Sequence, residues 1–176
     1  MSAWAGRALV AALAVLFALQ LVNVKRNWAA IGRVSTPRGS EAPDVTLPLL
    51  DGGTLHVAAE RGHPLVLAFW ASWCGPCMSE LPGVERVAKA LAHAPHRARL
   101  YAVNTEGNRD GALEGKMRLG LTMPIALDDN SASQAYQVTT IPHTVILDAD
   151  GRIAAVLRGV QSEDELMRAI VAVEGK

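Results

Sequence analysis

The sequence predicts an α/β domain, and two neighbouring segments indicate this class. Residues 64–71 form a continuous apolar run of strand length, which is typical of a central strand that is buried on both faces. Directly after it, apolar side chains recur at helical spacing: Leu81, Val84, Val87, Ala88 and Leu91. We therefore expect a buried strand to end, and a helix to begin, close to residue 74.

The flanking sequence predicts further strands and helices. Residues 46–50 and 55–57 enclose Asp51-Gly52-Gly53, a pattern that predicts a β-hairpin. Residues 99–103 predict a second central strand. Residues 108–119 predict a helix that two internal glycines weaken, because glycine is a poor helix former.

The C-terminal third predicts a short helix, a strand pair and a final helix. The short helix is expected at residues 130–136, and the strands at residues 144–147 and 153–157 with a turn between them. Ser162 and Glu165 have the spacing of a capping box, which marks the start of a helix. The apolar face of this last helix consists of Leu166, Ile170 and Val173.

The composition indicates one globular domain behind an apolar leader. Of the 176 residues, 50% are hydrophobic, which is enough for a single core. The 17 basic residues balance the 17 acidic ones, and no basic stripe is present. Nucleic-acid binding is therefore not favoured.

Residues 8–24 are almost entirely apolar and long enough to span a bilayer, which needs about 17–25 residues. We expect residues 1–24 to be a transmembrane signal-anchor, with a cleaved signal peptide as the alternative. Residues 25–41 then form a polar linker, and residues 42–176 form the domain.

The segment Trp73-Cys74-Gly75-Pro76-Cys77 contains both cysteines of the chain. Two thiols at this spacing near a strand–helix junction form a redox arrangement, in which one thiol attacks a disulfide and the other resolves the mixed disulfide. Since a helix N-terminus favours negative charge, we expect a lowered thiol pKa for Cys74, the nucleophile, and a more buried Cys77 as the resolving thiol. Half of a zinc site is the alternative, but no second cysteine pair or histidine cluster supplies the other ligands, so we expect no metal.

Two segments resemble the thioredoxin superfamily: residues 69–77, Phe-Trp-Ala-Ser-Trp-Cys-Gly-Pro-Cys, and residues 140–144, Thr-Ile-Pro-His-Thr. The apolar N-terminal segment, Glu80-Leu81-Pro82 and residues 136–151 narrow the resemblance to membrane-anchored thiol–disulfide oxidoreductases of the TlpA/ResA type. The resemblance extends from residue 42 to the C-terminus. It implies a thioredoxin fold, which is a central mixed β-sheet flanked by helices, with the hairpin added at its N-terminal side.

The resemblance also implies roles for individual residues. Cys74 and Cys77 would form a redox-active disulfide, with no other cofactor. Ile141-Pro142 resembles the family's cis-proline step beside this disulfide, and Pro82 resembles the proline that kinks the following helix. The positions expected to contact substrate are Trp73, Gly75, Pro76 and Ile141.

Three positions bear on the details of this resemblance. Thioredoxin has a buried acidic residue where this chain has Ala68, so the proton acceptor for Cys77 must lie elsewhere. Glu80 is a candidate because it follows Cys77 by three residues and shares its helix face. In the TlpA/ResA type a glutamate at this position tunes the cysteines, and a solvated helix glutamate is the alternative. Gln137 stands where the family often has glycine, and we expect it to alter only a loop.

The resemblance implies an extracytoplasmic thiol–disulfide oxidoreductase that reduces protein disulfides. The Gly-Pro dipeptide between the cysteines matches thioredoxin, with a potential near about −270 mV, rather than strongly oxidising enzymes near about −120 mV. The clients would be apocytochrome c cysteines or copper-site thiols of a respiratory oxidase. A membrane thiol-reductant donor would return the protein to its reduced form. The protein would be a monomer that is anchored in the bacterial inner membrane, with its catalytic domain in the periplasm.

Charges around the apolar segment favour the opposite orientation. Lys25, Arg26 and Arg33 follow it, whereas only Arg7 and the amino terminus precede it. The positive-inside rule alone would therefore place the domain in the cytoplasm. We follow the resemblance, because the charge bias is small and a cytosolic thioredoxin has no need of an anchor.

Three other functions are compatible with a cysteine pair. A disulfide-donating oxidase would use the same residues in the opposite direction. A thiol peroxidase is disfavoured, because Leu67 and Ala71 stand where the pattern Pro-x-x-x-Thr-x-x-Cys requires Pro and Thr. A Cu(I) chaperone for a respiratory oxidase would use the two thiolates, with Met78 or His143 as an added ligand.

Overall fold

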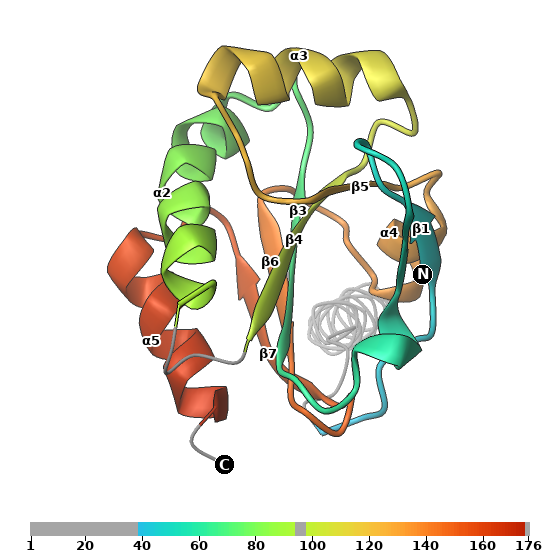
Figure 1. The fold of residues 1–176 in the computed structure, drawn as a ribbon, viewed down its shortest axis with the longest axis vertical. Helices are drawn as coiled ribbons and strands as arrows, with labels where there is room; N and C mark the ends of the chain where they lie inside the picture. Colours follow the sequence, from blue (N-terminus) through green and yellow to red (C-terminus); the bar gives the residue numbers. More distant parts are fainter. Residues whose placement is uncertain (1–38, 94–97, 175–176) are drawn as a thin grey trace, which may run out of the picture. The chain divides into compact units, whose positions relative to one another are not determined.

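The computed structural model describes residues 39–93 and 98–174. A five-stranded mixed sheet with the order β5-β4-β3-β6-β7 forms the centre of the domain (Figure 1). The strands β3, β4 and β5 are parallel, whereas β6 is antiparallel to both β3 and β7. Their bounds are β3 Leu65–Trp70, β4 Arg99–Asn104, β5 Ile125–Leu127, β6 His143–Leu147 and β7 Ile153–Arg158. The predicted α/β class with a mixed sheet is confirmed.

Every residue of the central strand β3 is buried. Val66, Ala68 and Trp70 belong to one core cluster, and the alternate residues Leu65, Leu67 and Phe69 belong to a second one. This division follows from the two-residue repeat of a strand, which points successive side chains to opposite faces. Both faces of the sheet are covered, so neither set of β3 side chains can be polar.

Helices cover one face of the sheet, and a smaller layer covers the other (Figure 1). On the first face, α2 (Gly75–Leu91) packs beside α5 (Glu163–Glu174), and α3 (Arg109–Leu119) contacts the start of α2. The second layer contains the strands β1 (Thr46–Pro48) and β2 (Thr54–His56), the 3₁₀ helix η1 (Val57–Glu60) and the short helix α4 (Ser131–Ala135). The sheet therefore separates two apolar cores.

Two local patterns form as the sequence predicts. β1 and β2 pair antiparallel across the Asp51-Gly52-Gly53 turn, where both glycines have positive φ and the Leu49 N–H donates to the Gly53 carbonyl at 3.0 Å. Ser162 and Glu165 form a reciprocal capping box at the start of α5. The Glu165 carboxylate accepts the Ser162 N–H at 2.9 Å, and the Glu165 N–H donates to the Ser162 hydroxyl at 3.3 Å.

The two glycines that weaken the α3 prediction are the positions where α3 approaches its neighbours. A Cβ on Gly115 would lie 2.5 Å from the Trp70 ring, and a Cβ on Gly111 would lie 2.6 Å from the Glu106 carboxylate. The helix forms nevertheless, with Asn108 as its N-cap. Close packing thus compensates for the low helix propensity of glycine.

The predicted apolar segment at residues 8–24 and most of the predicted linker lie outside the described residues. Within residues 39–93 and 98–174, no helix is both long and apolar enough to cross a membrane. At the end of the predicted linker, the Gly39 N–H donates to the Ile153 carbonyl at 2.7 Å. The chain therefore contacts the sheet from residue 39 onward.

We expect Gly115→Ala to destabilise the protein by about 1–3 kcal/mol, because the added methyl group overpacks against the Trp70 ring. Gly83→Ala is the matched control, since its Cβ would meet other atoms only at ordinary contact distances of 3.7 Å or more. This control should stabilise the protein by about 0.5–1 kcal/mol through helix propensity. Urea unfolding of both variants measures the two effects, and equal effects would contradict the packing explanation.

Candidate active site

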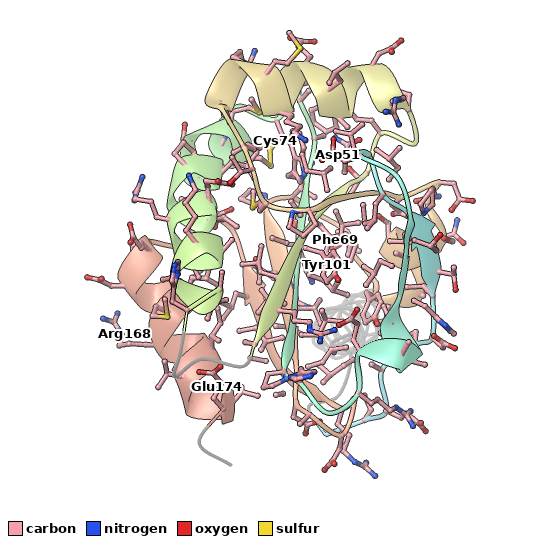
Figure 2. All side chains as sticks on the ribbon, viewed as in Figure 1. Asp51, Phe69, Cys74, Tyr101, Arg168 and Glu174 are labelled. Atoms are coloured by element: carbon pink, nitrogen blue, oxygen red, sulfur yellow. A yellow bond between two sulfur atoms is a disulfide. The ribbon has the colours of Figure 1, made fainter. Side chains whose placement is uncertain are left out.

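The cysteine motif lies where β3 ends and α2 begins, as predicted. Cys74 is the N-cap residue of α2, and its Sγ accepts the Cys77 N–H at 3.2 Å. The two cysteines form a disulfide. Figure 2 shows Cys74 at the end of α2 that adjoins α3. The first turn of α2 carries no acidic side chain, so the partial positive charge of the helix N-terminus is not opposed there.

The two cysteines differ in burial. Cys74 is 5% exposed, whereas Cys77 is fully buried. The residues around Cys74 reach solvent: Trp73 is 73% exposed, and Gly75 and Pro76 are exposed as well. A partner can therefore approach Cys74 more directly than Cys77, which supports the assignment of Cys74 as the attacking thiol.

A second loop meets the motif at the start of β6. The peptide bond between Ile141 and Pro142 is cis, as the resemblance implies. The Ile141 carbonyl oxygen lies 3.9 Å from the Sγ of Cys74. The Pro142 carbonyl accepts the Gly159 N–H at 3.0 Å, which ties this loop to the end of β7. The disulfide thus lies between the N-terminus of α2 and the cis-proline loop.

Glu80 is a buried residue rather than a solvated helix glutamate. Only 8% of it is exposed, and its Oε1 accepts the Gln161 N–H at 2.7 Å. Burial raises the pKa of the Glu80 carboxyl, and the hydrogen bond from Gln161 offsets only part of that increase. The alternative of a solvated side chain is therefore wrong, because α5 and the loop before it cover this part of α2. The tuning of the cysteines by Glu80 stays a prediction.

The His143 ring lies on the opposite side of the sheet from the sulfur atoms. His143 follows the cis-proline, is 1% exposed, and packs edge-on against Phe69 with ring centroids 6.1 Å apart. Phe69 belongs to one core cluster and both cysteines to the other. Neither ring nitrogen of His143 has a hydrogen-bond partner among the described residues. This placement does not support the ring as an added copper ligand.

Potential metal ligands are scattered in the described part of the chain. Within residues 39–93 and 98–174, no three or more His, Cys, Asp or Glu side chains gather closely enough to hold a metal ion. The Cys74–Cys77 pair itself can perform exchange between a dithiol and a disulfide.

Glu106 is a residue of the site that the sequence analysis missed. Its carboxylate accepts hydrogen bonds from the N–H and the hydroxyl group of Ser72, at 2.7 and 2.9 Å. Ser72 precedes Cys74 by two residues. A signal was present in the sequence, because a polar segment directly follows the second central strand. In a parallel pair, the carboxyl end of that strand must lie beside the carboxyl end of β3.

Residues 38–156 match the AhpC/TSA family. The chain belongs to the AhpC/TSA family. Among the relatives of this chain, the thioredoxin-like protein YneN of Bacillus subtilis is 29% identical over 133 residues, which cover 76% of this chain and 78% of YneN. The thiol-disulfide oxidoreductase ResA of Geobacillus kaustophilus is 28% identical over 137 residues, which cover 77% and 78% of the two chains.

A solved structure of a thiol–disulfide exchange protein is also similar to this chain. The putative thiol:disulfide interchange protein DsbE of Chlorobium tepidum superimposes with a TM-score of 0.71 at 25% identity, over 79% of this chain and 99% of that one. The thioredoxin-like fold is therefore confirmed, as is the resemblance to thiol–disulfide oxidoreductases of the ResA type. The enzyme class that the motif predicts, a protein-disulfide oxidoreductase, agrees with the names of ResA and DsbE.

The buried His143 should make stability depend on pH. Burial, together with the nearby Arg158, lowers the pKa of this ring to about 4 from its usual 6.5, so the unfolded chain binds the proton more tightly. Stability should therefore fall as the pH decreases from about 6.5 to about 4, by up to about 3 kcal/mol. Urea unfolding between pH 7 and pH 4 measures this loss.

The variant His143→Leu should remove most of this pH dependence, because leucine fills a similar volume and binds no proton. His93→Gln is the control, since His93 is an exposed residue whose Nδ1 lies 2.8 Å from the Lys89 carbonyl of its own helix. An unchanged pH profile in His143→Leu would show that other groups cause the acid sensitivity.

Proposed function

We propose that this protein is an extracytoplasmic thiol–disulfide oxidoreductase that reduces disulfides in client proteins. The observation that carries the proposal is the Cys74–Cys77 disulfide at the N-terminus of α2, beside the carbonyl group of the cis-proline step. Cys74 is 5% exposed and has exposed neighbours, whereas Cys77 is fully buried. This difference suits a sequence of two exchange reactions.

The reaction begins with the reduced protein. The Cys74 thiolate attacks one sulfur of a client disulfide, a mixed disulfide forms, and the other client sulfur leaves as a thiolate. Cys77 then loses its proton and attacks the Cys74 sulfur, which releases the second client sulfur as a thiolate. Two electrons pass from the dithiol to the client, and the protein is left with the Cys74–Cys77 disulfide. Protons from solvent complete the client thiols.

An extended client segment could bind next to the Cys74–Cys77 disulfide. Trp73, Gly75 and Pro76 form the exposed surface next to Cys74. On the other side of the disulfide, the Ile141 backbone borders the sulfur, and the proline after it has no N–H to donate. A client strand that pairs with Ile141 would therefore place its own cysteine beside Cys74.

The direction, location and partners of the reaction belong to the proposal. The apolar segment at residues 8–24 is consistent with a single-pass anchor in the bacterial inner membrane, with the domain in the periplasm. In this oxidising compartment, a reductase needs a membrane donor that supplies electrons. Proteins with cysteines that must stay reduced before they bind haem or copper are the proposed clients.

The equilibrium reduction potential tests the direction. The Gly-Pro dipeptide leads us to expect a value at or below about −250 mV in dithiothreitol redox buffers, as for reductants of the thioredoxin type. The protein should then catalyse insulin reduction by dithiothreitol, and Cys74→Ser should abolish the catalysis. A potential near about −120 mV would instead identify a disulfide donor and overturn the proposed direction.

Glu80→Gln tests whether Glu80 tunes the cysteines. A carboxylate one helical turn from Cys77 disfavours a second negative charge, so its loss should lower the pKa of the Cys77 thiol. The raised pKa of Glu80 also suits a group that accepts the Cys77 proton, so the resolution step should slow at neutral pH. Thiolate absorbance at 240 nm and stopped-flow kinetics measure the two effects.

Glu85→Gln is the matched control on the same helix. Glu85 is another buried glutamate of α2, and it accepts the N–H groups of Thr122 and Met123, at 3.0 Å each. Its replacement should lower stability without a change in the thiol pKa values. If Glu80→Gln behaves like this control, Glu80 has only a structural role.

A further inference from the structure

Glu106 joins the ends of the two central parallel strands. It lies two residues after β4, whose last residue Asn104 pairs with Trp70, the last residue of β3. Between them, the Thr105 N–H donates to the Trp70 carbonyl at 2.9 Å. The backbone of the Glu106 segment is therefore fixed against the end of β3, immediately before the chain turns into the cysteine motif.

The Glu106 carboxylate makes three hydrogen bonds within this junction. Its Oε2 accepts the Ser72 N–H at 2.7 Å and the Asn104 side-chain amide at 2.9 Å, and its Oε1 accepts the Ser72 hydroxyl at 2.9 Å. The Glu106 N–H returns a bond to the Asn104 Oδ1 at 3.2 Å. Burial alone would raise the pKa of Glu106, but these hydrogen bonds outweigh it and lower the pKa. The carboxylate is therefore charged at neutral pH.

The space around this carboxylate is shaped by α3. Gly111 lies so close that a Cβ there would be 2.6 Å from the Glu106 Oε1. From the C-terminal end of α3, the Arg118 guanidinium donates to the Ser72 carbonyl at 3.4 Å. Ser72 is thus held at its N–H, its hydroxyl group and its carbonyl, by residues from two different segments.

Cys74 is buried and its N–H donates to the Ala71 carbonyl at 3.1 Å, whereas its neighbours in the motif are exposed. Trp73 is 73% exposed, and the exposed Gly75 and Pro76 follow Cys74. Side-chain burial therefore does not fix where Trp73 is presented to a partner. The backbone on both sides of Trp73 does: it is held through Ser72 on the N-terminal side and through the buried Cys74 on the other.

We propose that Glu106 is a positioning residue for the attacking thiol, acting through Ser72 to set the placement of Trp73 and Cys74 at the N-terminus of α2. This inference rests on the proposed thiol–disulfide exchange. The carboxylate touches neither sulfur and takes no part in bond exchange. It restricts the movement of the loop that carries the nucleophile. Without this restriction the thiol would often be misplaced, and misplacement of a reacting group alone slows a reaction.

The test uses the reduced full-length protein and two rates, each measured across pH. The first is alkylation of Cys74 by limiting iodoacetamide, with the modified cysteine identified by mass spectrometry. The second is reduction of insulin disulfides. The plateau rate at high pH, where the thiol is fully ionised, reports placement, whereas the midpoint reports the thiol pKa. Alkylation needs no client, so it separates failure of this inference from failure of the proposed function.

For Glu106→Gln and Glu106→Ala we expect the plateau rate of insulin reduction to fall about tenfold, since a docked reaction depends on the orientation of both partners. The alkylation plateau should fall less, because a small reagent needs no docking. Ser72→Ala removes only the hydroxyl bond and should give a smaller loss of the insulin rate. Glu106→Gln keeps the size of the side chain and decides the question if Glu106→Ala does not fold.

Glu85→Ala is the control for a purely structural role. Glu85 also anchors backbone N–H groups as a buried carboxylate, but those groups belong to Thr122 and Met123. It should lower the melting temperature and leave both plateau rates unchanged. If Glu106→Gln also keeps the wild-type plateau rates well below its melting temperature, the positioning role is overturned. If wild type alkylates normally but does not reduce insulin, the proposed function fails instead.

Discussion

Strand β3 is buried on both faces, and its side chains alternate between two separate cores. This burial fixes the direction of β3 and the position along the sheet at which the strand ends. The motif must begin where β3 leaves the sheet, so Cys74 falls at the first turn of α2. The two neighbours of β3 bring the other parts of the site. β6 carries the cis-proline step on one side, and β4 ends next to Glu106 on the other.

Three glutamates, the buried Glu80 and Glu85 and the half-buried Glu106, hold loops around this framework. Glu80 accepts the N–H of Gln161, Glu85 those of Thr122 and Met123, and Glu106 that of Ser72. Burial raises a carboxyl pKa and hydrogen bonds to the charged form lower it, so the balance depends on the number of bonds. Glu85 and Glu106 each accept several and have lowered pKa values, whereas Glu80 accepts one and has a raised value.

This difference separates the roles of the three carboxylates. A group with a strongly favoured charge makes a stable anchor, because it does not exchange its proton near neutral pH. Glu80 is the group whose environment brings its pKa closer to neutrality, and it lies one helical turn from the resolving cysteine. The proton acceptor that Ala68 cannot provide is therefore best sought at Glu80, while Glu106 acts through geometry.

The strand β5 and the 3₁₀ helix η1 were not predicted from the sequence. The sequence alone did predict the strands β3, β4, β6 and β7, the helices α2 to α5, the hairpin, the capping box of α5 and the identity of the redox pair. These features depend on residues that are close together in the chain, where spacing translates directly into local structure. The two glycines of α3 indicated a weak helix because glycine has a low helix propensity, but the helix forms. Glycine is needed at these positions because Trp70 and Glu106, which come from other parts of the chain, leave no room for a Cβ.

Only the tertiary structure decided which polar groups meet. Gln161 is 81 residues from Glu80, and Glu106 is 34 residues from Ser72, so no local pattern could reveal either hydrogen bond. The position of His143 was likewise open, because its side of the sheet depends on the register between β6 and β3. A shift by one residue would have turned the ring toward the sulfur atoms. Spacing along the chain thus specified the reacting pair, and long-range packing specified its surroundings.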